Sequence, residues 1–295
     1  MSLADMMLHV FCWVDDALRH LRLDRPRSRG PAPILADAEV ITIEVVGELL
    51  GLACDARLFW HFRQHHAADF PALAHIHRTT FLRQAANLWR VKRALHKELA
   101  ARLIPDDSCW LADSVPVYAC RFSRAKYSRL FRGQAAYGYD HAQKQTYYGF
   151  RLHTRVSREG VIRAFELAPA NVSDRAALPA LDLPLGSQGI GDRNYWSPDL
   201  RDELASAGIR LYAPFSSRAK DRDKARSTAL SRERWLIETV QGQLAERYEV
   251  KRVRARDLWH LCHRLIRKVL SHTVAVMLCV RSRVPPLQFS RLLAA

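Results

Sequence analysis

The sequence is short of acidic residues and contains no long apolar run. It has 30 Asp and Glu residues against 46 Lys and Arg residues in 295 positions, which gives a formal charge of +16. The longest apolar stretch, Thr273 to Val280, is far shorter than the ~20 residues that span a bilayer. The N-terminus lacks a basic start, and Asp15 and Asp16 interrupt its apolar stretch, so no secretory signal is expected. These absences predict a cytoplasmic protein with no membrane partner.

Paired cysteines are also absent. The six cysteines are scattered, and none forms a CxxC pair. This distribution is typical of reduced thiols that fill space in a core, and it argues against a structural zinc site.

The excess of positive charge favours a polyanionic partner. Hydrophobic residues make up 48% of the chain, which is enough to build a core, so the charge is not that of a disordered tail. Nucleic acid is the usual partner of such a protein. An anionic membrane is the alternative, but the sequence contains neither a basic amphipathic helix nor a lipidation signal.

The hydrophobic pattern changes near residue 104. Before it, apolar residues such as Ile41, Val45 and Leu49 recur at helical spacing, and Ala36 to Glu39 is typical of the acidic first turn of a helix. From Ile104 onward period-two alternation begins. We therefore expect an all-helical N-terminal region, residues 1–103, and a second domain, residues 104–295, that includes a C-terminal helix.

The second domain is expected to be α/β. Strands are predicted at Trp110–Tyr118, Thr146–Val156, Val161–Ala168, Gln188–Asp192 and Ile209–Ala213, and helices at 197–208, 228–248 and 258–280. Pro116 should make the last part of the first strand an edge or a bulge. The order of these elements predicts a mixed sheet flanked by helices, as in the ribonuclease H-like fold.

Asp113 and Asp192 are carboxylates that structure alone does not readily explain. Asp113 shares a strand face with Leu111 and Val115, where an unpaired charge is costly and calls for a metal or another cation. Asp192 ends a short strand after Gly191, at the carboxyl end where sites gather in α/β proteins. The alternatives are an aspartate that binds local backbone at the first position and a turn aspartate at the second.

Glu238 follows the buried residue Ile237 in the helix predicted at 228–248. Arg234 lies one turn earlier, so the simplest alternative is an i,i+4 ion pair of a few tenths of a kcal/mol. Together with the two aspartates, Glu238 could hold two divalent ions, Mg²⁺ or Mn²⁺, as hard oxygen ligands do in enzymes that cut phosphodiester bonds. Residue pattern and charge alone leave this hypothesis open.

Several motifs resemble those of a known family. They are Asp113–Val117, Tyr147–His153, Pro169–Asp174, Gly191–Tyr195, Ile237–Val240 and, in the N-terminal region, Leu35 to about Leu88. In order and spacing the chain resembles the DDE transposases of the IS4/IS5 type, most closely the IS982 group of insertion sequences. The resemblance implies that Asp113, Asp192 and Glu238 form the catalytic, metal-binding triad, and that Arg234 matches the arginine one turn before the catalytic glutamate.

The resemblance also implies partners. These are double-stranded DNA, both element ends and target, and further copies of the chain in a homo-oligomer assembled on DNA. The N-terminal region would bind DNA ends or help assembly, with a packing cap as the alternative. Basic residues near the triad would bind DNA, although a charge run is more often a solvated face; they are Arg121, Arg124, Lys126, Arg193, Lys220 and Arg234. His153, on the polar face of its strand, is expected to touch DNA.

Three functions compete. The first is a transposase that cleaves at the element ends and joins the freed 3′ hydroxyl to target DNA. The second is a ribonuclease H-like nuclease without strand transfer. The third is a non-catalytic DNA-binding protein descended from a transposase, against which the three intact acids argue.

Overall fold

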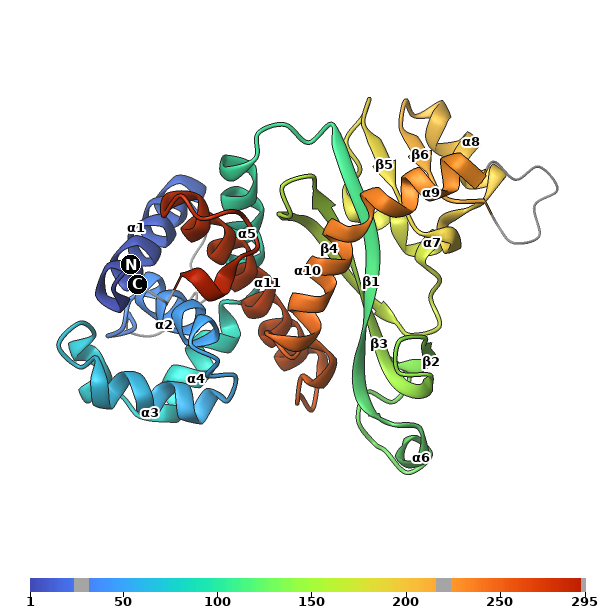
Figure 1. Ribbon diagram of the computed structural model, residues 1–295. Helices are drawn as coiled ribbons and strands as arrows, with labels where there is room; N and C mark the ends of the chain where they lie inside the picture. Colours follow the sequence, from blue (N-terminus) through green and yellow to red (C-terminus); the bar gives the residue numbers. More distant parts are fainter. Residues whose placement is uncertain (24–31, 216–223, 293–295) are drawn as a thin grey trace. The chain divides into compact units, whose positions relative to one another are not determined.

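The computed structural model describes residues 1–23, 32–215 and 224–292, and it divides the chain into two compact units (Figure 1). The first unit comprises Met1–Leu103, Arg247–Glu249 and Ala255–Ala295. The second comprises Ile104–Glu246 and Val250–Arg254.

The first unit consists of helices in the ranges that are described. They are α1 (Leu3–Leu21), α2 (Asp37–Leu49), α3 (Asp55–His65), η1 (Pro71–Ala74), α4 (Arg78–Asn87), α5 (Trp89–Leu103), α11 (Leu258–Arg281) and η5 (Phe289–Arg291). The acidic turn at Ala36–Glu39 does open α2, because the Ala36 N–H donates to Glu39 Oε2 at 2.7 Å. Across the described ranges, no helix combines the length and apolar character needed to cross a membrane.

The last helix differs from its predicted place. The hydrophobic pattern predicts it within residues 104–295, whereas α11 packs against α5, α2 and α4 of the first unit. Its middle is buried all round, polar residues such as Ser271, His272 and Thr273 included. A helix buried on every side must be enclosed by others, and the N-terminal helices supply that enclosure.

Buried ion pairs join α2, α5 and α11. Lys92 Nζ on α5 lies 2.6 Å from Glu44 Oε2, and Arg267 Nε on α11 lies 2.7 Å from Glu48 Oε1. Burial raises the pKa of Glu44 and lowers that of Lys92, and their mutual attraction offsets part of each shift. Charges buried in this way require their partners, so these pairs fix the relative register of the three helices.

The second unit is built on a mixed sheet. Its strands are β1 (Cys109–Arg121), β2 (Ala136–Asp140), β3 (Gln145–Ser157), β4 (Ile162–Pro169), β5 (Gln188–Ile190) and β6 (Arg210–Tyr212). The order is β2-β3-β1-β5-β6, and β4 also pairs with β3. β3 is antiparallel to β1, β2 and β4, whereas β1, β5 and β6 are parallel.

The helices of this unit are mostly short. They are α6 (Phe122–Ala125), α7 (Asp174–Ala177), η2 (Leu178–Leu181), η3 (Arg193–Tyr195), α8 (Pro198–Ser206), α9 (Lys224–Glu233), α10 (Trp235–Glu246) and η4 (Val250–Arg252). The single helix predicted at 228–248 is therefore two helices, interrupted at Arg234.

Pro116 lies where β1 has a neighbour on one side only. β5 pairs with Cys109 to Leu111 and ends there, whereas β3 continues along β1 past Pro116. A proline cannot donate to a ladder, so it is tolerated where that side of the strand is open. The predicted edge is confirmed, and a register shift follows between Tyr118 and Cys120.

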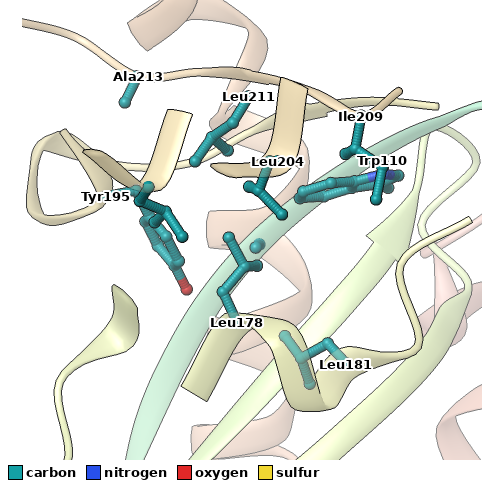
Figure 2. Packing of buried hydrophobic residues seen from close by; sticks show 10 residues of the cluster. Trp110, Leu178, Leu181, Tyr195, Leu204, Ile209, Leu211 and Ala213 are labelled. Carbon is teal, nitrogen blue, oxygen red and sulfur yellow. The ribbon is translucent and has the colours of Figure 1, made fainter. Parts of the chain in front are cut away.

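An apolar cluster holds the parallel part of the sheet (Figure 2). Trp110 of β1 lies near Leu204 of α8 and Ile209, and Leu178 and Leu181 of η2 close the other side. The Trp110 Nε1–H donates to Ser187 Oγ at 2.8 Å, which satisfies its polar atom in the core. This packing holds the segments of β1 and β5 that directly precede Asp113 and Asp192.

Candidate active site

The register of two parallel strands places Asp113 and Asp192 beside each other. Leu111 of β1 is paired with Ile190 of β5, and each aspartate follows its paired residue by two positions. The Asp192 charge raises the pKa of Asp113, as expected of a like charge at short range.

Asp113 is held in a half-buried position on β1. The Ser114 N–H donates to its Oδ1 at 2.8 Å, and Arg234 Nη2 lies 3.4 Å from its Oδ2. Burial raises the pKa of Asp113 to about 7, against the lowering effect of these two groups, and the Asp192 and Asp174 charges add to the rise. A carboxylate whose ionised form is disfavoured by burial is stabilised by a cation bound beside it.

Asp192 is oriented by the residues that follow it. It caps η3, accepting the Asn194 N–H at Oδ1 (2.8 Å) and the Asn194 Nδ2 amide at Oδ2 (2.9 Å). Burial raises the pKa of Asp192, and the Asp174 charge adds to that rise. A Cβ at Gly191 would lie 2.6 Å from the Tyr195 ring, so glycine is needed for this ring to pack against the strand end.

Glu238 approaches the same place from α10. The helix buries Ile237, Val240 and Leu244, and it is anchored by Gln241 Nε2, which donates to Thr154 Oγ1 at 2.8 Å. The Glu238 side chain is 61% exposed, which leaves it free to take a ligand.

Arg234 connects Glu238 with Asp113. Its Nη2 atom lies 3.4 Å from Asp113 Oδ2 and 3.8 Å from Glu238 Oε1. Because both oxygens lie close to the same nitrogen, Asp113 Oδ2 and Glu238 Oε1 are separated by no more than the sum of these two distances. Asp113 and Glu238 would be the residues of this pair that hold divalent ions, which would supply charge neutralisation beside a phosphate.

Asp174, at the start of α7, is a further acid in this region. It is 5% exposed, accepts from Ser114 Oγ at 2.6 Å and lies 3.3 Å from Arg151 Nη1. Burial opposes its ionisation, but the adjacent His153, the hydrogen bond from Ser114 and the nearby Arg151 bring its pKa below the usual value. Asp174 ends the motif Pro169–Asp174, but its sequence context alone predicts no role for it.

His153 is not on a polar face, so the expected DNA contact is wrong. The side chain is fully buried, and its Nδ1 lies 3.2 Å from Asp174 Oδ1. Period-two alternation suggests one solvent-exposed face, but both faces of β3 are covered at this point. His153 therefore helps to hold Asp174.

The donor set suits a hard divalent cation. The described side chains do not include three His, Cys, Asp or Glu residues already arranged around a metal position. Mg²⁺ commonly takes one or two carboxylates and completes its shell with water and substrate phosphate oxygens. The buried Tyr195 hydroxyl has no hydrogen-bond partner in the described ranges, and burial and the Asp174, Asp113 and Asp192 charges raise its pKa. This hydroxyl can donate a hydrogen bond to a water molecule of a hydrated ion.

The predicted DNA-binding residues lie in different parts of the second unit. Arg193, in η3, is exposed beside Asp192. Arg121, Arg124 and Lys126 are exposed at the other end of β1, where Arg121 is roughly 25 Å from Asp113 at ~3.3 Å per residue. Arg234 is 17% exposed. Lys220 lies outside the described residues.

Comparisons with known proteins identify the family. Paired carboxylates and a basic surface on a mixed α/β unit are features of enzymes that act on nucleic acids. The family model of the transposase DDE domain matches residues 106–258, more than half of the chain, and the chain therefore belongs to the DDE transposases. It is a DNA transposase, an enzyme dependent on divalent metal, with DNA as its partner.

No curated protein matches the chain. A solved structure, the cryo-EM structure of a piggyBac transposase synaptic complex with hairpin DNA, is similar with 10% identity and a TM-score of 0.45, covering 96% of this chain and 76% of that one.

Proposed function

We propose that Asp113, Asp192 and Glu238 bind two divalent ions, Mg²⁺ or Mn²⁺, and that this site cuts the ends of an insertion sequence of the IS4/IS5 type, within the IS982 group. The observation that carries the proposal is the convergence of the two aspartates through the β1–β5 register and of Glu238 through Arg234. The sheet, in which β1, β2 and β4 are antiparallel to β3 and β5 and β6 run parallel to β1, supports a ribonuclease H-like fold.

The reaction has two displacements. In the first, a water oxygen bonds to phosphorus at the element end, the P–O3′ bond breaks, and the 3′ oxygen leaves with a proton. In the second, that 3′ hydroxyl bonds to a target phosphorus and the target 3′ oxygen leaves. The bound ions supply activation of the attacking oxygen and stabilisation of the leaving one.

The chain's own residues position these groups. The Ser114 N–H and Asn194 orient Asp113 and Asp192, so that their oxygens need no rearrangement before the reaction. Arg234 can hold a phosphate with its planar fork once cations occupy the carboxylates. Arg193 and, farther away, Arg121, Arg124 and Lys126 would bind the flanking backbone, and copies of the chain would assemble on the two ends.

The test is an assay on DNA that carries the element's ends and a separate target plasmid. Mg²⁺ should give cleavage at the ends and joined products, and a chelator should abolish both. Cleavage without joining would reduce the function to a nuclease. Binding without either reaction would favour the non-catalytic descendant.

Arg234 separates a phosphate-binding role from a simple ion pair. We expect Arg234→Ala, and less severely Arg234→Lys, to slow cleavage at least about tenfold, because lysine lacks the fork that binds two phosphate oxygens. An arginine that only balanced Asp113 and Glu238 would matter for stability rather than for the cleavage step, because Arg234 and Asp113 are mostly buried. The measurement is a single-turnover cleavage rate over a Mg²⁺ titration, with a thermal melt.

Arg158→Ala is the matched control, because Arg158 forms an exposed ion pair with Glu233 at 3.7 Å. It should cleave at the normal rate. Near-normal cleavage by Arg234→Ala, or a rate restored by added Mg²⁺, would return Arg234 to the ion-pair role.

A further inference from the structure

Exposed aromatic rings gather where β1 passes through α6 into β2. We call the exposed Phe122, Tyr137 and Tyr139, together with the partly buried Tyr148, the aromatic row. Phe122 is 58% exposed, Tyr137 49% and Tyr139 43%. The Phe122 and Tyr137 ring centroids are 5.7 Å apart, and those of Tyr137 and Tyr148 are 5.3 Å apart. Large apolar side chains that pack on one another at the surface, rather than into a core, indicate a binding surface.

The backbone explains why the rings share one face. Tyr137 is paired with Tyr148 across β2 and β3, and Tyr139 lies two residues farther along the same strand. Gly138, between the two tyrosines, points to the opposite side, where a Cβ would lie 2.7 Å from the Ala170 Cβ. That side is filled, so the tyrosines can lie only on the open face of β2.

Positive charge surrounds the aromatic row. Residues 121–139 contain five cations and no acid. All five cations are exposed, and none forms an ion pair with a residue in the described ranges; they are Arg121, Arg124, Lys126, Arg129 and Arg132. The next acid, Asp140, is buried and paired with Lys251 at 2.8 Å. The charge of the segment is therefore available to a polyanion.

We propose that the aromatic row and its surrounding cations bind unpaired nucleotides of a DNA strand that flanks the cut. Bases would stack on Phe122 and Tyr137, and the cations would hold the phosphates between them. The identity of the polymer as DNA rests on the proposed function, whereas the preference for an unpaired strand rests on this surface alone.

Duplex DNA accounts for the cations but not for the rings. A duplex presents phosphates along its outside, and lysines and arginines suffice to bind them. Its base faces are already stacked, so they cannot lie on a tyrosine. Bases of an unpaired strand have free faces, and proteins that bind single strands use aromatic side chains beside a basic groove. Arg121 is roughly 25 Å from Asp113 along β1, which assigns the surface to a flanking strand rather than to the reacting phosphate.

The test compares two double variants of the full chain. Phe122→Leu with Tyr137→Leu keeps apolar bulk and removes the aromatic faces, whereas Phe122→Tyr with Tyr137→Phe keeps them. The probes are a fluorescent oligothymidine, a blunt duplex of equal length and an oligouridine, each titrated in a chelator so that no cutting occurs.

The leucine variant is expected to lose about tenfold or more in affinity for oligothymidine. Its affinity for the duplex should stay within about twofold, because phosphate contacts dominate there and also report a folded protein. The aromatic variant should bind both DNA probes normally. These results would support the inference even if the wild type proved unable to cleave DNA.

Other outcomes would overturn it. If the leucine variant bound oligothymidine as tightly as the wild type, base stacking on these rings would be contradicted. If it lost equal affinity for single strand and duplex, the proposed preference for unpaired nucleotides would be contradicted. Tighter wild-type binding of oligouridine would assign the surface to RNA. A leucine variant that bound normally but lost an oligomer in light scattering would make the aromatic row a contact between copies of the chain.

Discussion

Replacing Asp113 or Asp192 by Asn is expected to lower the rate of DNA cleavage at least about a thousandfold while DNA binding stays within about twofold. The amide removes a charged metal ligand, and losing several kcal/mol of transition-state stabilisation corresponds to that factor. Both positions can accept the amide without a cavity, because its volume equals that of the carboxyl group. Binding survives because it depends mainly on lysines and arginines.

The measurement is cleavage of end-containing DNA beside a binding titration of the same DNA. Asp202→Asn is the control, since Asp202 is exposed on α8 of the same unit and, among the residues that the structure describes, pairs only with its neighbour Arg201. It should cleave normally. Wild-type rates in Asp113→Asn or Asp192→Asn would remove that residue from the site.

Replacing Lys92 by Met should destabilise the helical unit by about 3–5 kcal/mol, because Glu44 would be left as a buried charge without its principal partner. Lys92 Nζ also donates to the Ala85 carbonyl at 3.0 Å, so a second buried acceptor loses its donor. Burial already raises the pKa of Glu44, and removal of Lys92 should raise it further. The loss should therefore be smaller near pH 5 than near pH 8, since protonation of Glu44 relieves the unpaired charge at low pH.

Denaturant unfolding of the full chain at both pH values measures this effect. Arg19→Met is the matched control, because Arg19 and Asp15 form an ion pair of equal length, 2.6 Å, on the exposed surface of α1. It should cost less than about 1 kcal/mol. A second variant, Lys92→Met with Glu44→Leu, should recover part of the loss. Equal stabilities of the Lys92 and Arg19 variants would show that the buried pair contributes nothing special.

The strand β1, which carries Asp113, and the β3–β4 hairpin could be predicted from the sequence, because apolar and polar residues alternate regularly in both. β2 was missed. It has only five residues, two of its side chains are exposed tyrosines, and no alternating apolar face marks it. Its pairing with β3 is a tertiary property, and without it the aromatic row could not be anticipated.

Around the site, the local sequence pattern predicted where each acidic residue lies in its strand or helix, but not which side chains contact it. Asp192 could be placed at a strand end, whereas its contact with Asn194 depends on the backbone of η3. The environment of Asp174 could not be inferred, since its partners Ser114 and His153 come from two other elements. For the same reason the alternation along β3 predicts an exposed His153, whereas the side chain is buried. Alternation shows which residues share a face of a strand, but not which other elements cover that face.

The division of the chain into two units determines which unit has its full sequence first during translation. The mixed α/β unit is nearly continuous in sequence, but the helical unit begins with residue 1 and is completed only by α11. At about 5–20 residues per second, a ribosome needs roughly ten to forty seconds to pass from Leu103 to Arg281. During that interval Glu44, Glu48 and the apolar sides of α2 and α5 lack the helix that encloses them. The sequence of the mixed α/β unit is thus synthesised before α11, the helix that completes the helical unit.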